Sequence, residues 1–226
     1  MVPGRRLAIL GKQGAGKGTQ AVRLCLHYVI PHISTGDIFR AAVKSGSDFG
    51  RRAKQYMDAG ELVPDGVVIG MVRERLAADD ARNRGFLLDG YPRTIAQAEA
   101  LDEMLAPRGL DLAVDIEIRT DVALKRLAGR RVCVDCGTNY STDQPPTVDW
   151  ICDVCSGKVV QRDDDTEAAI TRRLVLYEEQ TNPLMAWYEQ TRRLVRVDGE
   201  ADPDAVTFRL TQAIDIHISA RGARPC

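Results

Sequence analysis

The stretch that decides the fold of this chain is Gly11-Lys12-Gln13-Gly14-Ala15-Gly16-Lys17-Gly18-Thr19. It follows the apolar run 7–10, which is typical of a buried strand, and it leads into residues whose apolar spacing predicts a helix. A glycine-rich turn between a strand and a helix presents backbone N–H groups and the positive end of the helix dipole to an anion. We therefore predict a phosphate-binding loop, with Lys17 on the β- and γ-phosphates of a nucleotide and the Thr19 hydroxyl beside Mg²⁺. The alternative, a glycine-rich turn with a solvated lysine, is disfavoured because the glycine spacing, the lysine and the strand–helix context coincide.

Composition bounds the kinds of protein that this chain can be. It has 226 residues, and its 31 basic and 32 acidic side chains give a formal net charge of −1. This length suits one large domain or one domain with inserts, and the balanced charge gives no overall field that would attract nucleic acid or an anionic membrane. No apolar stretch approaches the roughly 20 residues of a membrane-spanning helix, and the N-terminus carries no signal-peptide pattern. We therefore expect a cytoplasmic protein.

Apolar runs that are typical of buried strands alternate along the chain with helical patterns. After the phosphate-binding loop, strands are predicted near residues 85–89, 112–118 and 194–197, and helices over 94–105 and from residues 120, 166 and 203 onward. Such alternation predicts an α/β fold with a parallel β-sheet core and helices on both faces. Asp89 ends the predicted strand near residues 85–89, at the edge where open parallel sheets bind ligands.

Two segments interrupt the alternation. Ser34 and Asp37 have the spacing of a capping box, and residues 34–63 are predicted to form a small helical insert. The second segment, between Arg130 and Asp165, is polar and rich in turn residues. It holds four of the six cysteines of the chain, and we interpret it as another insert.

The cysteines of the second insert form two Cys-x2-Cys pairs, Cys133 with Cys136 and Cys152 with Cys155, separated by 15 residues. This spacing is typical of a structural zinc site, in which four thiolates complete a tetrahedral shell and leave no position for a catalytic water. The large apolar residues of the insert are few, mainly Val132, Tyr140 and Trp150. Metal binding would therefore supply folding free energy that the insert lacks. Four unrelated free thiols or two disulfides are the alternative, and a reducing cytosol disfavours the disulfides.

Six arginines flank predicted element ends or the cysteine insert: Arg40, Arg93, Arg126, Arg130, Arg162 and Arg173. Forked, permanently charged guanidinium groups can converge on phosphate, although each arginine taken alone could equally be a solvated surface residue. The three histidines belong to no motif, so sequence offers no catalytic histidine.

The ordered motifs of this chain resemble those of adenylate kinase in its long bacterial form with a zinc-bearing lid. They are GKQGAGKGTQ at 11–20, STGDIFR at 34–40, GFLLDGYPRTIAQ at 85–97, AGRR at 128–131, RDDD at 162–165 and TRRL at 171–174. The resemblance implies a P-loop nucleoside monophosphate kinase fold with a core of residues 1–33, 64–128 and 166–226. It also implies an AMP-binding insert over 34–63, a zinc-binding lid over 129–165, and transfer of the γ-phosphoryl group of ATP to AMP to give two ADP.

The resemblance also implies roles for individual residues, by motif position. For ATP they are Gly14, Ala15, Gly16, Lys17, Gly18, Thr19, Arg126, Arg130, Asn139, Tyr140 and Ala201. For AMP they are Thr35, Arg40, Glu61, Leu62, Val63, Gly90, Tyr91, Pro92, Arg93, Gln97, Arg162 and Arg173. The implied catalytic residues are Lys17, Asp89, Arg93, Arg130, Arg162 and Arg173. Asp89 would hold Mg²⁺ through water, Asp164 and Asp165 match the hinge pair of the lid, Cys133, Cys136, Cys152 and Cys155 would hold structural Zn²⁺, and the protein would be a monomer.

Two alternatives to this function remain open on sequence. The first is a kinase for another nucleoside monophosphate, for example of the UMP/CMP or GTP:AMP type. Thr35 and Gln97 favour adenine as the acceptor base, because a glutamine amide can donate to N1 or accept from N6. The second is a P-loop module whose cysteine insert binds nucleic acid, which acidic residues in the insert disfavour. These acids are Asp135, Asp143, Asp149 and Asp153.

Overall fold

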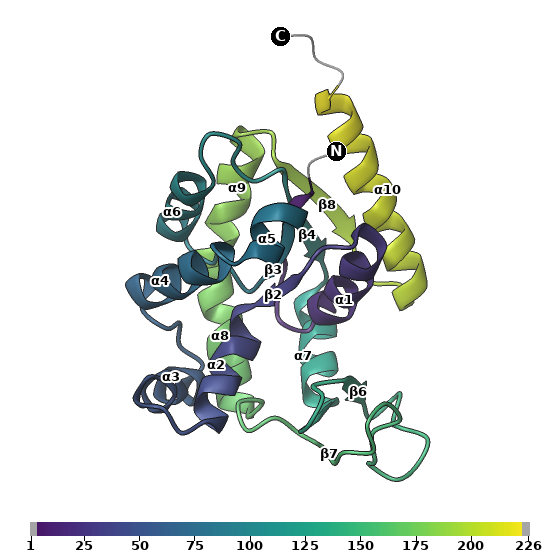
Figure 1. The fold of residues 1–226 in the computed structure, drawn as a ribbon. Coiled ribbons are helices and arrows are strands. Elements are labelled where there is room, and N and C mark those ends of the chain that lie inside the picture. The colour runs from purple at the N-terminus through teal and green to yellow at the C-terminus, as the bar shows by residue number, and fades with distance from the viewer. Residues whose placement is uncertain (1–3, 223–226) are drawn as a thin grey trace.

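The computed structural model describes residues 4–222 and has a parallel five-stranded sheet at its centre (Figure 1). The strands are β1 (Arg6–Leu10), β2 (His32–Ser34), β3 (Phe86–Asp89), β4 (Leu112–Glu117) and β8 (Leu194–Asp198). Their order across the sheet is β2-β3-β1-β4-β8, and every neighbouring pair is parallel. The predicted α/β fold with a parallel sheet is thus confirmed.

Helices cover both faces of the sheet and create two hydrophobic cores. One core joins Leu7 and Ile9 of β1 to α1 (Lys17–Tyr28), α7 (Thr120–Ala128), α8 (Glu167–Leu176) and α10 (Pro203–Gly222). The other joins Ala8 and Leu10 to α4 (Asp65–Leu76), α5 (Asp79–Arg84), α6 (Ile95–Leu105) and α9 (Asn182–Gln190). Because both faces are buried, successive residues of β1 are apolar, as expected of an internal parallel strand.

The register of the strands brings the predicted ligand-binding segments to one edge of the sheet. Ile9 of β1 and Ser34 of β2 both pair with Asp89 of β3, and Leu10 pairs with Asp115 of β4. Parallel strands end at the same edge, so the loop after β1, the start of α2 (Thr35–Lys44) and the turn after β3 lie side by side.

The segment between β2 and α4 forms two helices, α2 and α3 (Asp48–Ala59), at the lower left of Figure 1. The Ser34 hydroxyl accepts a hydrogen bond from the Asp37 N–H at 3.2 Å, which confirms the predicted cap. Ser47 caps α3 in the same way, through the Gly50 N–H at 3.0 Å.

The cysteine-rich segment forms a second, smaller sheet that the sequence did not predict. Its strands are β5 (Arg130–Cys133), β6 (Asn139–Ser141) and β7 (Val159–Val160), antiparallel in the order β6-β5-β7. These strands are too short for an alternating pattern to show in the sequence, since their pairing depends on tertiary contacts.

Helix α8 is joined to α9 without a break through a π-helical turn, η1 (Tyr177–Thr181), and α9 begins at Asn182 with Pro183 in its first turn. The Asn182 N–H donates to the Tyr177 carbonyl, and the wider turn accommodates a proline that has no N–H of its own. Within residues 4–222 no helix combines the length and the apolar character needed to cross a membrane.

Candidate active site

The glycine-rich loop has the geometry of an anion-binding turn. Gly14 and Gly16 have φ angles of 86° and 90°, which side chains other than glycine rarely adopt. A Cβ on Gly14 would also lie 2.8 Å from the Ala123 carbonyl oxygen of α7. Gly16 is the N-cap residue of α1 and has no side chain to bond the first N–H groups of that helix. The first backbone N–H groups of α1 therefore have no capping side chain and are available to bind an anion. Thr19, in the first turn of α1, is exposed.

The Lys17 ammonium lies inside this loop. Its Nζ donates to the carbonyl oxygens of Gly11 at 2.6 Å and Lys12 at 2.8 Å. Burial lowers the pKa of Lys17 to about 8; the Asp89 carboxylate opposes this shift, whereas Arg93 and Arg130 add to it. These effects require the carboxylate and both arginines to lie near the ammonium, although the four residues come from separate segments.

On the β2–β3 side of the loop, buried polar contacts hold the predicted AMP-binding residues. Thr35 is buried, and its hydroxyl donates to the Gly90 carbonyl at 3.0 Å. The Gln97 amide oxygen accepts from the Arg93 N–H at 2.8 Å, and its Nε2 donates to Asp65 at 2.6 Å. Asp65 was not singled out from the sequence, where it reads only as an acid in the first turn of a helix.

The remaining predicted AMP-binding residues of this side lie in the segments 61–63 and 91–92. Buried Tyr91 donates its hydroxyl proton to the Gln97 carbonyl at 2.9 Å, and Pro92 is buried beside it. Glu61 forms an ion pair with Arg172 of α8 at 2.7 Å. Leu62 is half-buried, and Val63 belongs to the core cluster around α4 and α6. The segment 61–63 therefore connects α3 to both α8 and the main core.

Arginines from different elements converge beside Asp89. Burial lowers the pKa of Arg93; Asp89 opposes the shift, and the positive charges of Arg173 and Arg40 add to it. Arg40 lies on α2, where it forms an ion pair with Asp37, and Arg173 lies on α8. Two guanidinium groups that are far from Arg93 in the sequence thus act on it at a single site.

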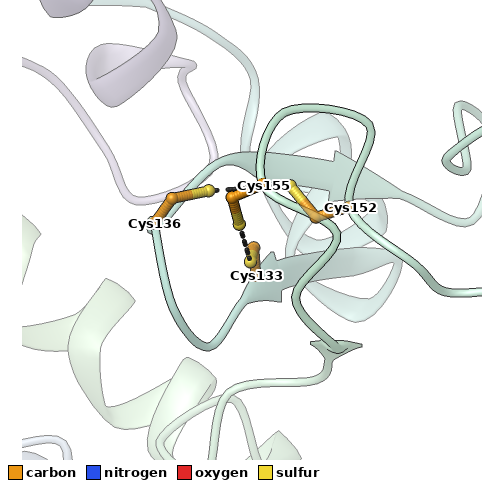
Figure 2. A group of neighbouring side chains, drawn as sticks. All are labelled: Cys133, Cys136, Cys152 and Cys155. Carbon is orange, nitrogen blue, oxygen red and sulfur yellow. Dashed lines mark hydrogen bonds between the residues drawn. The ribbon is translucent and has the colours of Figure 1, made fainter.

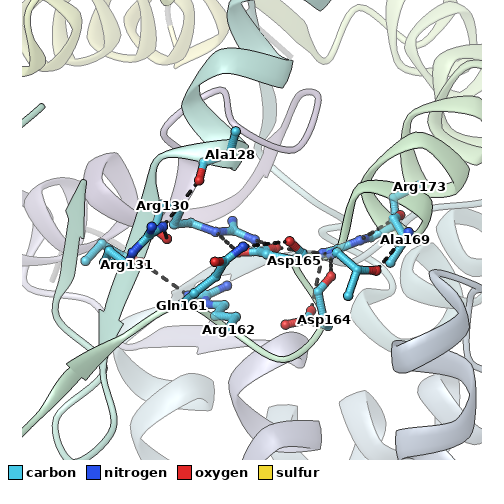
Figure 3. Close-up of polar contacts among 11 residues, drawn as sticks. Ala128, Arg130, Arg131, Gln161, Arg162, Asp164, Asp165, Ala169 and Arg173 are labelled. Atoms are coloured by element: carbon cyan, nitrogen blue, oxygen red, sulfur yellow. Dashed lines mark hydrogen bonds and ion pairs between the residues drawn. The ribbon is translucent and has the colours of Figure 1, made fainter. Parts of the chain in front are cut away.

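Two carboxylates hold the arginines at the base of the cysteine-rich segment (Figure 3). Asp165, whose side chain is 0 % exposed, accepts from Arg130 Nε at 2.7 Å and from Arg173 Nη2 at 3.1 Å. Asp164 accepts from Arg173 Nη1 at 3.3 Å and from the same guanidinium through its backbone carbonyl. The predicted hinge pair thus fixes the directions of two predicted catalytic arginines.

Arg162 is less fully paired than its neighbours. It donates one hydrogen bond, from Nη2 to the Asn139 side chain at 3.2 Å, and its buried Nε has no hydrogen-bond partner among the residues that the structure describes. Burial lowers the pKa of Arg162 to about 10, with the charges of Arg130 and Arg40 adding to the shift. An anion bound among Arg40, Arg130 and Arg162 would reduce the repulsion between their charges. It could also accept a hydrogen bond from the unpaired Nε of Arg162.

Asp89 has the position and chemistry to hold Mg²⁺ through water. It ends β3 at the ligand edge of the sheet, and its Oδ2 lies 3.5 Å from His32 Nε2. Mg²⁺ prefers oxygen ligands and is usually held by one or two carboxylates, waters and substrate phosphates. A single carboxylate beside a phosphate-binding loop fits that requirement.

The remaining predicted ATP-binding residues lie on the other side of the loop. Arg126 donates from Nη1 to the Gly14 carbonyl at 3.4 Å and from Nη2 to the Gly199 carbonyl at 3.1 Å. Ala201, half-buried, packs against the core that contains α1 and α10. Arg126 thus spans the space between the phosphate-binding loop and the turn after β8.

The cysteine-rich segment reaches the start of α1. The Asn139 amide nitrogen would lie 3.7 Å from a Cβ placed on Gly18. Tyr140, in contrast, points its hydroxyl away from the loop, since it donates to Cys152 Sγ at 3.4 Å and accepts from the Asp153 N–H at 2.8 Å. Asn139 is therefore near the phosphate-binding loop, whereas the Tyr140 ring supports the cysteine cluster.

The four paired cysteines meet at one point (Figure 2). Their Sγ atoms all lie within 4.8 Å of one another, with 3.4 Å between Cys133 and Cys155 and 3.6 Å between Cys136 and Cys152. Four thiolates about 2.3 Å from a tetrahedral Zn²⁺ would be about 3.8 Å apart, so the observed cluster fits this ion.

The fold and the site together define a phosphotransferase of the P-loop nucleoside monophosphate kinase class. The sequence model of the family described as "Adenylate kinase" matches residues 9–193. The chain belongs to the adenylate kinase family.

Curated relatives agree with this assignment. An adenylate kinase from Moorella thermoacetica is 52% identical over 212 residues, which cover 92% of this chain and 97% of the relative. Adenylate kinases from Geobacillus sp. and Acidothermus cellulolyticus are 49% and 50% identical over 203 and 212 residues; the matches cover 88% and 92% of this chain and 94% and 97% of the relatives. These names favour adenylate kinase over a kinase for another nucleoside monophosphate.

Proposed function

We propose that this chain transfers the γ-phosphoryl group of Mg-ATP reversibly to AMP and thereby forms two ADP. The observation that supports this most is the convergence of positive charge at the ligand edge of the sheet. Lys17, Arg93, Arg130, Arg162 and Arg173 come from the phosphate-binding loop, the turn after β3, the cysteine-rich segment and α8. The charges of neighbouring arginines in this set help to lower the pKa of Lys17, of Arg93 and of Arg162, so the five side chains lie close together. Two nucleotides that meet end to end bring five phosphates, which need that amount of compensating charge.

ATP is proposed to occupy the loop side of the site. Backbone N–H groups of residues 14–19 would bind its phosphates, and Arg126 would lie against the adenine between the loop and the turn after β8. Asn139 and the backbone of Tyr140 and Ala201 would complete the contacts. Asp89 would hold the Mg²⁺ of Mg-ATP through water, and the ion would neutralise part of the phosphate charge.

AMP is proposed to occupy the β2–β3 side. Arg40 and Arg93 would bind its phosphate, and Thr35, Gln97, the turn 90–93 and residues 61–63 would surround the nucleoside. Each end of the Gln97 amide already makes one hydrogen bond, and an amide can make two at each end. Gln97 therefore keeps one donor and one acceptor for an adenine edge, in an orientation that Asp65 and Arg93 fix.

Transfer on this site needs no general base, because the attacking oxygen of AMP is already ionised near neutral pH. The residues of the chain align the two phosphates and stabilise the charge of the transition state. Asp164 and Asp165 hold Arg130 and Arg173 in place before substrate arrives, which reduces the ordering that binding requires.

Residues 34–63 and 129–165 are proposed to move as an AMP-binding insert and an ATP-covering lid, about a core made of 1–33, 64–128 and 166–226. Closure of the lid over both substrates would exclude water, the competing acceptor. Cys133, Cys136, Cys152 and Cys155 are proposed to hold a structural Zn²⁺ that stabilises this lid.

We further infer a cytoplasmic monomer that acts on ATP, AMP and ADP. The exposed Asp135, Asp149 and Asp153 of the lid disfavour nucleic acid as a partner.

The proposal is tested by an acceptor panel of AMP, GMP, CMP and UMP with Mg-ATP, applied to the wild type, Lys17→Met and Lys125→Met. We expect AMP to be the preferred acceptor and Lys17→Met to lower turnover by about 10²–10³-fold, as loss of one transition-state donor does. Lys125→Met removes an exposed lysine of α7 and should leave turnover unchanged. Equal use of all four acceptors, or near-normal turnover of Lys17→Met, would reject the proposed acceptor or the proposed role of Lys17.

The pKa of Lys17 adds a pH test. Because the free protein has this pKa at about 8, its ammonium loses the proton as the pH rises through 8. The KM for ATP should therefore increase above pH 8. A KM that stays constant to pH 9.5, about 1.5 units above the shifted value, would contradict a phosphate contact by Lys17.

A further inference from the structure

A cavity of about 430 Å³ lies at the carboxyl ends of β4 and β8, between these strands and the π-helical turn η1. Its walls include Lys12, Asp115, Glu117, Tyr177, Asp198 and Glu200. No residue with a proposed role in ATP, AMP or Zn²⁺ binding lines this cavity. It is therefore a separate space, next to the back of the phosphate-binding loop.

Asp115 is the one acid of this cavity for which the described residues offer no hydrogen-bond or ion-pair partner. It is 4 % exposed, and its buried Oδ1 accepts no hydrogen bond. The other acids are paired: Glu117 with Arg196, Glu178 with Lys12, Asp198 with Arg209 and Glu200 with Arg119. Buried carboxylates are almost always paired in folded proteins, so an unpaired one that lines a cavity indicates a missing partner.

The electrostatics of Asp115 indicate that the missing partner is positive. Burial raises the pKa of Asp115 to about 6 and the nearby Glu117 adds to the shift, whereas Arg196, Lys17 and Lys12 oppose it. At neutral pH the group is still mostly ionised, so it presents a desolvated negative charge. Lys12 is already bonded to Thr120 at 2.9 Å and to Glu178 at 2.8 Å. A cation from outside the chain would therefore be stabilised at Asp115.

The spacing of the acids argues against a single metal ion. In the described part of the chain, the cysteine cluster is the only group of three or more metal-ligating side chains close enough to share an ion. Asp115 and Glu117 are two positions apart on β4, so both side chains lie on the same face of the strand. The rise of a parallel strand places their Cα atoms about 6.6 Å apart. This spacing suits two positive charges joined by a short chain.

The wall between the charges suits an alkyl chain. Tyr177 is buried beside Asp115, whose charge helps to raise the pKa of the Tyr177 hydroxyl, and its side chain lines the cavity with Ile118. An aromatic ring can contact methylene groups and the face of an ammonium. The outer acids Glu117, Asp198 and Glu200 lie at the partly exposed end, with Glu117 57 % exposed.

We propose that this cavity binds a small aliphatic diammonium cation, with one ammonium bonded to Asp115 and the other at Glu117 and the outer acids. None of the residues proposed to contact a nucleotide lines this site. Its ligand is recognised by two charges and the methylene chain between them.

The experiment titrates 1,4-diaminobutane into the nucleotide-free protein at neutral pH, with binding followed by calorimetry and by methyl NMR of isoleucine-labelled protein. We expect saturable binding and shifts of the Ile116 and Ile118 signals. Asp115→Asn should weaken binding about tenfold or more, as loss of a charge-assisted hydrogen bond does, and Glu117→Gln a few-fold. Glu103→Gln removes an exposed acid of α6 and should change nothing.

Several outcomes would overturn the proposal. They are the absence of saturable binding, shifts confined to residues outside the cavity, and binding that neither Asp115→Asn nor Glu117→Gln weakens. Equal affinity for n-butylamine would overturn the requirement for two charges, and displacement by equimolar Mg²⁺ would reassign the cavity to a metal ion. Glu117→Gln alters an exposed side chain, so it keeps the test decisive if Asp115→Asn fails to fold.

Discussion

The two segments inserted into the parallel fold, α2–α3 and the cysteine-rich segment 130–165, are of similar length but are stabilised in different ways. Phe39 and Ala53 of α2 and α3 belong to the same core cluster as β3 and α6, and the Phe39 and Phe49 rings stack with centroids 5.7 Å apart. In the cysteine-rich segment Cys133, Cys152 and Val159 form a small cluster of their own, with Tyr140 and Trp150 around it.

This difference shows two solutions for a short insert. The helices α2 and α3 extend the main core, so their stability depends on the whole domain. The hydrophobic core of the cysteine-rich segment is too small to offset the conformational entropy that is lost when the segment folds. Metal binding by its four cysteines would supply the missing stabilisation. The first insert should therefore unfold with the domain, and the second should be able to unfold alone.

The largest expected effect tests this independence directly. Cys152→Ser, or removal of the proposed Zn²⁺ with a chelator, should unfold the segment 130–165, because structural Zn²⁺ sites supply on the order of 10 kcal/mol of folding free energy. The amides of β5 would then lose protection from hydrogen exchange, while those of β1, β3 and α2 would keep theirs. Loss of protection in all of these elements at once would show that the two inserts do not differ.

The second prediction concerns the connection between the cysteine-rich segment and the core. Asp165→Asn leaves Arg130 and Arg173 without their buried carboxylate, and breaking such a pair should lower the free energy of unfolding by about 4 kcal/mol. Denaturant unfolding measures this loss. The matched control is Asp163→Asn, which changes an exposed acid two positions away and should cost almost nothing. Equal small effects would mean that Asp165 does not anchor the two arginines.

The third prediction compares equivalent truncations in the two inserts. Phe39→Ala should lower the free energy of unfolding of the whole domain by about 3 kcal/mol, because it opens a cavity in the main core. Trp150→Ala should leave the main thermal transition in place and instead increase hydrogen exchange in β5 and β6, since the Trp150 ring packs on the cysteine cluster and under Arg131 of β5, both within the same segment. A lowered main transition for Trp150→Ala would indicate that the small cluster is coupled to the large one.

The smallest effect is expected at a helix cap. Ser47→Ala removes the acceptor for the Gly50 N–H and should destabilise the domain by about 1 kcal/mol, a typical loss for an N-cap. Ser47→Asp should restore the stability, because aspartate also accepts from this N–H and favours the positive end of the helix. Denaturant midpoints of the three proteins provide the measurement. The Ser47 hydroxyl also donates to the Ala42 carbonyl at 3.1 Å, which an aspartate cannot do, so failure of the rescue would assign the stabilisation to that bond and not to the cap.

Features that were predictable from the sequence share one property, which is that neighbouring residues determine them. The glycine loop needs adjacent backbone N–H groups, the Ser34 cap needs a residue three positions on, and the cysteine pairs are spaced by two residues. Each was found where the pattern indicated. The order of the motifs along the chain then identified the family, because a set of local signals in a defined sequence is much more specific than any one of them.

Features that were missed depend on residues far apart in the chain. The strands β5, β6 and β7 are two to four residues long and exist because they pair with one another. Asp65 orients Gln97 from 32 positions away, and its role as an acceptor could not be distinguished from that of an ordinary first-turn acid. The unpaired state of Asp115 likewise becomes visible only when all its neighbours in space are known.

The sequence by itself therefore determined the class of fold, the phosphate-binding loop and the family, because backbone geometry and ligand spacing are written in short stretches of chain. Tertiary structure alone decided which carboxylates restrain which arginines, how each insert is stabilised, and which buried charge stays unpaired. Electrostatic and packing energies depend on distance in space, and distance along the chain does not reveal it.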